Sequence, residues 1–159
     1  MKQRINVFEK HAKKFNGLHA LGAHLSKSSV GQSLLELVYF RVSQINGCAF
    51  CLDMHSKDLR AKGETEQRLY ALNAWRETPF FIDRERSALA WAEAVTACHV
   101  PDDVYEEALR HFTEEELVDL TLGAIAINGY NRVNVAFRTP AGGYQPGQFE
   151  EQAKQVAIL

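Results

Sequence analysis

The hydrophobic residues of this chain recur mostly every three or four positions, which is the spacing of amphipathic helices. Segments in which apolar and polar residues alternate, as they do in half-buried strands, are nearly absent. We therefore predict an all-α protein, a compact helical bundle whose helices are joined by short connections. The predicted helices cover residues 4–16, 18–29, 31–45, 48–61, 64–78, 83–97, 101–112 and 114–137.

Residues near the ends of these segments support the boundaries. Gly17 is expected to separate the first two helices, and Gly47 to end the third. Asp83 has the short polar side chain that is typical of a helix N-cap. Thr113 and Glu116 have the spacing of a capping box, in which each side chain accepts a hydrogen bond from the other residue's backbone N–H.

Size and composition indicate one domain. The chain has 159 residues, 46% of them hydrophobic, which is enough to form a sizeable core. We expect a single helical domain over residues 1–139 and a C-terminal arm over residues 140–159, because a Pro-Ala-Gly-Gly sequence follows the last predicted helix. The formal net charge of −2 gives no polycationic surface, so nucleic acid is not an expected partner.

The distribution of apolar residues and cysteines bears on where the protein works. No apolar run approaches the ~20 residues of a membrane span, and no apolar core follows the early basic residues as it does in a signal peptide. The three cysteines are an odd number, which argues against a secreted disulfide framework. We therefore expect a cytoplasmic protein with no membrane partner.

The segments 31–45 and 117–137 are too apolar for a monomer, and they predict a homo-oligomer.

The segment that gives the clearest indication of a chemical function is residues 48–55, with the sequence CAFCLDMH. In a helix, Cys48, Cys51 and His55 would share one face, because they are separated by three and then four positions. Two adjacent thiols can exchange between dithiol and disulfide, and a helix N-terminus or a nearby imidazole favours the reactive thiolate. This segment therefore predicts thiol redox chemistry.

Glu36 is the only acidic residue in the apolar stretch 34–42. A carboxylate buried there must be paired, hydrogen-bonded or protonated, because burying an isolated charge is too unfavourable. One interpretation is a salt bridge with Arg41 or Arg132. The other is a proton acceptor with a raised pKa that serves the thiols, since Glu36 precedes Cys48 by only twelve positions across a predicted bend.

Glu36 followed by Cys48-x-x-Cys51-x-x-x-His55 resembles the catalytic pattern of the alkylhydroperoxidase D-like (AhpD-like) proteins of the carboxymuconolactone decarboxylase superfamily. The segments 41–48, 72–77, 85–91 and 131–137 are also similar to that family, and the resemblance covers roughly residues 18–139. It implies an oligomeric all-α fold, as a homotrimer or homohexamer.

The resemblance also implies a thiol-dependent peroxidase in which Cys51 attacks a hydroperoxide and Cys48 then forms the disulfide. Glu36 and His55 would move protons, and an external dithiol or protein reductant would restore the thiols. No flavin, haem or nucleotide signature is visible, so no cofactor is expected. The residues alone leave the order open, because Cys48 would lie at a helix start while Cys51 would lie one turn from His55.

Three other considerations qualify this assignment. Phe50 stands where well-studied peroxidases of the family have a second histidine, which predicts weaker activity that depends more fully on Glu36 and His55. True lactone decarboxylases of the superfamily lack the cysteine pair, so lyase activity is less expected. The competing class is a zinc-binding or redox-sensing interaction module, since both cysteines, His55 and Glu36 could supply four zinc ligands.

The remaining reactive or polar residues are expected to be structural. Cys98 is predicted to be a small buried hydrophobic residue rather than a third redox partner. The histidines without a partner at ligand spacing are assigned to the surface or to helix caps: His11, His19, His24, His99 and His111. A polar set in the last apolar helix is expected to form a structural network with Glu36 or a neighbouring subunit: Asn131, Arg132 and Asn134.

Overall fold

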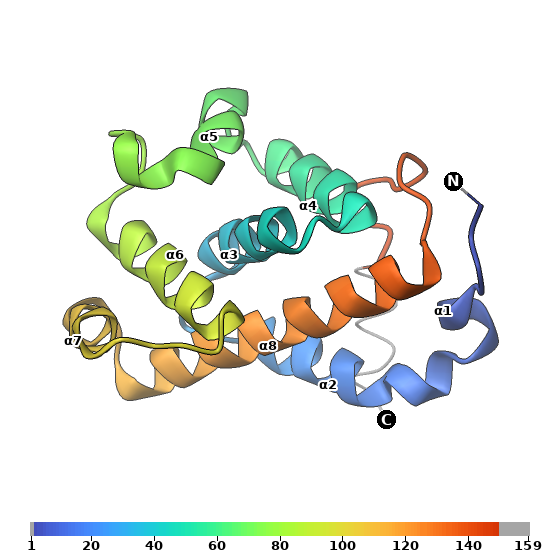
Figure 1. The fold of residues 1–159 in the computed structure, drawn as a ribbon, viewed down its shortest axis with the longest axis horizontal. Coiled ribbons are helices and arrows are strands. Elements are labelled where there is room, and N and C mark those ends of the chain that lie inside the picture. Colours follow the sequence, from blue (N-terminus) through green and yellow to red (C-terminus); the bar gives the residue numbers. More distant parts are fainter. Residues whose placement is uncertain (1, 150–159) are drawn as a thin grey trace.

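The structure is a computed structural model and describes residues 2–149. Every regular element within these residues is a helix, so the prediction of an all-α bundle is confirmed (Figure 1). In chain order the elements are α1 (Val7–Lys10), the 3-10 helix η1 (Ala12–Phe15), α2 (Asn16–Leu25), α3 (Gln32–Asn46), α4 (Ala49–Ala61), α5 (Glu66–Ala71), the 3-10 helix η2 (Leu72–Glu77), α6 (Asp83–Thr96), α7 (Asp102–His111) and α8 (Glu114–Phe137).

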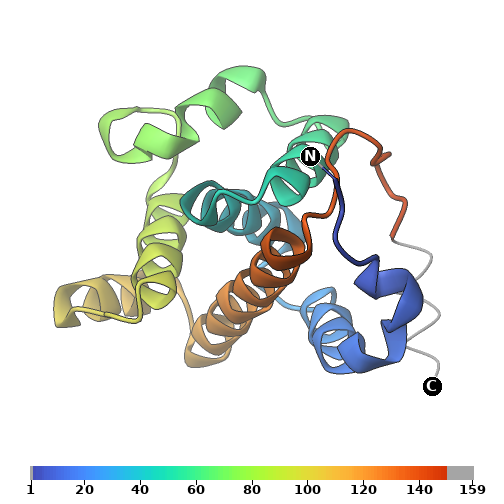
Figure 2. The same cartoon turned by 45° about the vertical axis from the view of Figure 1, so that its right-hand side comes forward.

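Helices α3 and α8 lie at the centre of the bundle in both views (Figures 1 and 2). Helix α8 packs against α2, α3 and α6, and α3 also packs against α4. Leu35, Val38 and Val42 of α3 belong to one apolar cluster, whereas Leu37 and Phe40 belong to a second cluster on another side of the same helix. Because α3 is covered on several sides, its one acidic residue is forced into a largely buried position.

A tight turn joins α3 to α4. Gly47 ends α3 in the left-handed region with a φ of 63°, and the Cys48 N–H donates to the Ser43 carbonyl at 3.2 Å. Cys48 is then the N-cap of α4. This turn brings α4 back alongside α3, as the packing of the two helices shows.

Several of the predicted helix boundaries are wrong. The helix predicted over residues 18–29 ends at Leu25, and the one predicted over 64–78 is α5 followed by the 3-10 helix η2. Gly17 lies inside α2, and the break comes earlier, at His11, whose φ of −135° is not helical. The N-cap of α6 is Ile82 rather than Asp83, and the Ile82 N–H is satisfied by the Glu85 carboxylate at 3.0 Å. The predicted capping box of α8 is confirmed, since Thr113 and Glu116 accept hydrogen bonds from each other's backbone N–H.

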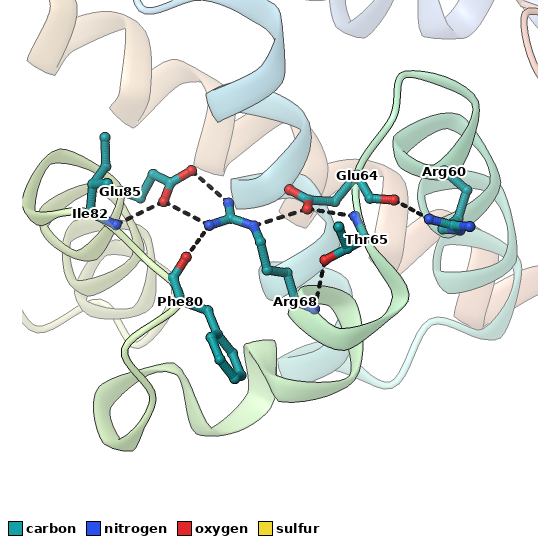
Figure 3. A network of polar contacts seen from close by, with 7 residues as sticks. All are labelled: Arg60, Glu64, Thr65, Arg68, Phe80, Ile82 and Glu85. Carbon is teal, nitrogen blue, oxygen red and sulfur yellow. Dashed lines mark hydrogen bonds and ion pairs between the residues drawn. The ribbon is translucent and has the colours of Figure 1, made fainter.

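Arg68 ties the connection between η2 and α6 to α5 (Figure 3). Its guanidinium bonds to Glu64 at 2.9 Å and to Glu85 at 2.7 Å, and it also donates to the Phe80 carbonyl. The same Glu85 carboxylate accepts from the Ile82 N–H, so one partly buried ion cluster orients both the loop and the start of α6.

The segment after α8 folds back onto α4. Tyr144 is buried and its hydroxyl donates to the Asp58 carboxylate at 2.9 Å, while the Lys57 ammonium donates to the carbonyls of Gly142 and Tyr144. Residues 150–159 of the predicted arm lie outside the described residues, and the domain boundary after residue 139 stays a prediction. Among residues 2–149 no helix has both the length and the hydrophobicity needed to cross a membrane.

Gly47→Ala is expected to lower the free energy of unfolding by about 1–2 kcal/mol, because a residue with a Cβ is strained at this positive φ. An added Cβ would meet no atom within 4 Å, so backbone strain is the only expected cost. Gly22, inside α2, is equally open but helical, and Gly22→Ala should raise stability by about 0.5–1 kcal/mol. Urea unfolding of the two variants would measure both effects, and changes of the same sign would contradict the assigned role of Gly47.

Candidate active site

Cys48 and Cys51 are joined by a disulfide at the start of α4. Their Cα atoms are 5.3 Å apart, and each residue is only 1% exposed. As N-cap, Cys48 places its sulfur 3.3 Å from the Cys51 backbone nitrogen, which donates to it. The pairing expected from the spacing is thus present. The sulfur that caps the helix is also the one nearest its positive end.

Cys98 does not take the buried position that we expected. It follows α6 in the left-handed region with a φ of 54°, and it is exposed as a free thiol. The prediction of a small buried hydrophobic residue is therefore wrong, because the chain turns outward at the end of this helix. Cys98 is not paired with Cys48 or Cys51.

Glu36 and His55 form a buried pair between α3 and α4. The His55 Nδ1 and the Glu36 Oε2 are 2.9 Å apart, and the two side chains are 7% and 14% exposed. The Lys62 ammonium lies 3.6 Å from the other carboxylate oxygen. Neither arginine proposed as a salt-bridge partner takes that role, because Arg41 pairs with Glu93 at 2.6 Å and Arg132 bonds to Asn128.

The charge state of Glu36 also differs from the expectation. Burial raises the pKa of this carboxyl, but the hydrogen bond and charge of His55, together with the charge of Lys62, outweigh burial and bring the pKa below its usual 4.5. Glu36 is therefore an anion at neutral pH, and the predicted raised pKa is wrong. As an anion it accepts the Nδ1–H of His55, which leaves Nε2 as the ring nitrogen that is not bonded to the carboxylate.

The His55 Nε2 is buried and has no hydrogen-bond partner among the described residues. Tyr39 lies beside the imidazole, with the ring centroids 5.6 Å apart. His55 lies one helical turn after Cys51 on α4, so this free nitrogen belongs to the same helix face as the sulfur. The arrangement is an imidazole held by a hydrogen bond to a carboxylate, one helical turn after a disulfide sulfur.

The polar residues of α8 divide into two groups. Asn131 is fully buried and bonds to Ser43 and Asn46 of α3, so it forms a structural network as expected, although not with Glu36. Asn134 instead reaches the redox pair, with its Nδ2 3.5 Å from the Cys51 sulfur. Sequence reasoning placed Asn134 in a structural network and missed this contact. The available signal was a buried amide three residues after another on an apolar helix.

The residues proposed as zinc ligands do not form a ligand set. The two sulfurs are bonded to each other, and the His55 Nδ1 is bonded to the Glu36 carboxylate. In the described part of the chain no three His, Cys, Asp or Glu side chains gather closely enough to hold a metal ion. The geometry is that of a disulfide beside a hydrogen-bonded acid–imidazole pair.

Comparison with known proteins identifies the relatives of this chain. The model of the carboxymuconolactone decarboxylase family matches residues 11–94. The chain belongs to this family. The uncharacterised protein YdfG of Bacillus subtilis is 40% identical over 139 residues, covering 86% of this chain and 95% of YdfG. The uncharacterised protein YnjA of Escherichia coli is 34% identical over 119 residues, covering 74% of this chain and 65% of YnjA.

Solved structures place this carboxymuconolactone decarboxylase family member among the AhpD-like proteins. A candidate AhpD antioxidant defence protein of unknown function from Agrobacterium tumefaciens aligns with a TM-score of 0.85 at 38% identity, covering 90% of this chain and all of that one. The debrominase Bmp8, in complex with 2,3,4-tribromopyrrole, aligns with a TM-score of 0.76 over 95% of this chain and 78% of its own, but at 16% identity it shows the shared fold alone. The family resemblance inferred from the Glu36–Cys48–Cys51–His55 pattern is confirmed.

Proposed function

We propose that this protein is a thiol-dependent peroxidase of the alkyl hydroperoxide reductase type, which cycles between the Cys48–Cys51 dithiol and its disulfide. The observation that carries the proposal is the buried Glu36–His55 pair, which leaves the His55 Nε2 without a partner, on the helical turn that follows Cys51. The Agrobacterium tumefaciens relative, which is described as a candidate AhpD antioxidant defence protein, supports the same reaction class.

In the first step the His55 Nε2 accepts the thiol proton of Cys51, and the Glu36 carboxylate stabilises the imidazolium that forms. The Cys51 thiolate then attacks the terminal oxygen of a hydroperoxide. The S–O bond forms as the O–O bond breaks, and the departing alkoxide takes the proton back from Nε2. The products are a Cys51 sulfenic acid and an alcohol, or water when the substrate is hydrogen peroxide.

In the second step Cys48 attacks the sulfenic sulfur of Cys51, and the disulfide forms with release of water. An external dithiol reduces this disulfide by exchange and becomes a disulfide itself, so the two electrons that reduced the peroxide come from that donor. The short Cα separation of 5.3 Å lets the pair open and close with little backbone movement.

Three further points belong to the same proposal: the assembly, the reductant and the effect of Phe50. We infer a homo-oligomer, because Val118, Ile125 and Val135 each expose half or more of their surface along α8. The family resemblance favours a homotrimer or homohexamer, and the odd number of cysteines favours the cytoplasm. The reductant in this proposal is an external dithiol or dithiol protein, because thiol–disulfide exchange is the reaction that reopens a disulfide. Phe50, half-buried between the cysteines, keeps its predicted effect of lowering the rate.

Steady-state peroxide consumption measured with a panel of dithiol donors tests this function. We expect catalytic turnover that requires a dithiol and stops when the donor is exhausted. If one equivalent of peroxide oxidises the protein once and none of the dithiols restores activity, a redox-sensing module is favoured instead. One equivalent of zinc held by the reduced protein, with no peroxide turnover, would favour the zinc-binding alternative.

A further inference from the structure

Asn134 of α8 makes a contact that its helix does not require. Its Nδ2 donates to the Tyr130 carbonyl at 2.9 Å and lies 3.5 Å from the Cys51 sulfur. Because a backbone carbonyl can only accept a hydrogen bond, the amide must present its NH2 group to this side. The second N–H of that group is then the one directed at the sulfur.

The other atom of the same amide is unsatisfied. Asn134 is only 5% exposed, and its Oδ1 has no partner among the described residues. Buried acceptors without a donor are rare in folded proteins and call for an explanation. Three side-chain atoms in the described part of the chain share this state, and two of them, the His55 Nε2 and the Asn134 Oδ1, belong to residues grouped around Cys51.

We propose that Asn134 is a catalytic residue of the peroxidase reaction proposed above, on which this inference rests. Its Nδ2 donates to the Cys51 thiolate, and its Oδ1 accepts the O–H of the bound hydroperoxide. The site therefore holds one donor for the attacking sulfur and two acceptors, one for the thiol proton and one for the peroxide hydrogen.

This role accounts for the atoms of the first step. The peroxide hydrogen, held on the Asn134 Oδ1, stays with the terminal oxygen when that oxygen bonds to sulfur. It becomes the hydrogen of the Cys51 sulfenic acid. The proton that the leaving alkoxide needs comes from the His55 Nε2, which received it from the Cys51 thiol, so no further acid is required.

The contact also distinguishes the two cysteines. The donor to the Cys48 sulfur is the backbone N–H of Cys51, whereas the side-chain amide of Asn134 donates to the Cys51 sulfur. A hydrogen bond to the charged form favours the thiolate. The helix N-terminus favours the thiolate of Cys48, and Asn134 gives Cys51 a donor of its own, so that Cys51 can be the attacking residue that the family resemblance implies.

The test uses the full chain with Cys48→Ser and Cys98→Ser, so that Cys51 is the only thiol. Asn134→Ala should raise the pH midpoint of Cys51 alkylation by iodoacetamide by about one pH unit. At a pH well above that midpoint, where the thiolate is complete, the rate of sulfenic acid formation with hydrogen peroxide should still be about tenfold lower, because the Oδ1 contact is lost. Asn131→Ala is the matched control, and both quantities should be unchanged in it.

Unchanged values in Asn134→Ala, relative to Asn131→Ala, would overturn the inference. Should Asn134→Ala not fold, Asn134→Ser keeps a shorter donor on the same Cβ and should change both quantities in the same direction by less. A Cys51 that is alkylated with an Asn134-dependent midpoint, but is not oxidised by peroxide in the parent, would reject the peroxidase function and the Oδ1 role while leaving the donor role intact.

Discussion

Cys51→Ser is expected to lower peroxide turnover by more than about 10³-fold, whereas Cys48→Ser is expected to consume one equivalent of peroxide and then stop. A serine hydroxyl at position 51 is not ionised at neutral pH and cannot attack the O–O bond. Without Cys48, Cys51 can still be oxidised, but the neighbouring thiol that converts the sulfenic acid into an intramolecular disulfide is missing.

Stopped-flow measurement of peroxide loss, with dimedone trapping of sulfenic acid, distinguishes these outcomes. Cys98→Ser is the matched control, because Cys98 is exposed, lies after α6 and is not part of the disulfide. Its turnover should equal that of the parent. A dimedone adduct on Cys48 in the Cys51→Ser variant, together with an inert Cys48→Ser variant, would reverse the assigned order of attack.

Glu36→Gln is expected to lower the rate of peroxide-dependent oxidation by roughly 10²-fold while the fold persists. Glutamine keeps the shape of the side chain and can still accept from the His55 Nδ1, which is 2.9 Å away in the parent. It carries no charge, however, so the imidazolium that forms when Cys51 loses its proton is no longer stabilised. The rate would be measured by stopped flow on the reduced protein.

Glu93→Gln is the matched control for Glu36→Gln. Glu93 is also a partly buried carboxylate, bonded to Arg41 at 2.6 Å and to the Trp75 indole N–H at 2.9 Å, but it touches no residue of the redox site. This variant should lose stability and keep its oxidation rate. An unchanged oxidation rate in Glu36→Gln, accompanied by a lower thermal midpoint of unfolding, would mean that Glu36 only forms a structural salt bridge.

The pH dependence of stability gives an independent check on Glu36. Because folding lowers the pKa of this carboxyl below 4.5, its ionised form stabilises the protein at neutral pH. That contribution is fully present above the unfolded-state pKa and is lost as the pH falls through the lower folded-state pKa. The difference in free energy of unfolding between the parent and Glu36→Gln should therefore shrink at acid pH, and a difference that grows there would contradict the assigned charge state.

Local signals in the sequence predicted most of the helices, and the misplaced boundaries have physical causes. Thr113 and Glu116 cap α8 as their spacing indicates, since a capping box is decided within four residues. Gly17 was expected to end a helix but lies in the first turn of α2, where glycine is tolerated. What ends the preceding short helix is the backbone conformation at His11, a residue with no strong preference for that position.

The cysteine pair could be predicted from its spacing, and the association of Glu36 with His55 from the family pattern, but the contact of Asn134 with Cys51 could not. Glu36 and His55 are 19 positions apart and meet only because the turn at Gly47 lays α4 along α3. Asn134 is 83 positions from Cys51, and its contact depends on how α8 packs against α4. The Asn134 contact comes from tertiary packing alone, about which neither helical periodicity nor the cysteine motif carries information.

The most direct test of the peroxidase cycle is mass spectrometry of the fully reduced protein after addition of one equivalent of peroxide. The account predicts loss of two hydrogen atoms, localised to a Cys48–Cys51 disulfide, while the exposed thiol of Cys98 stays reduced. Oxidation confined to Cys98, with Cys48 and Cys51 recovered as free thiols, would contradict it.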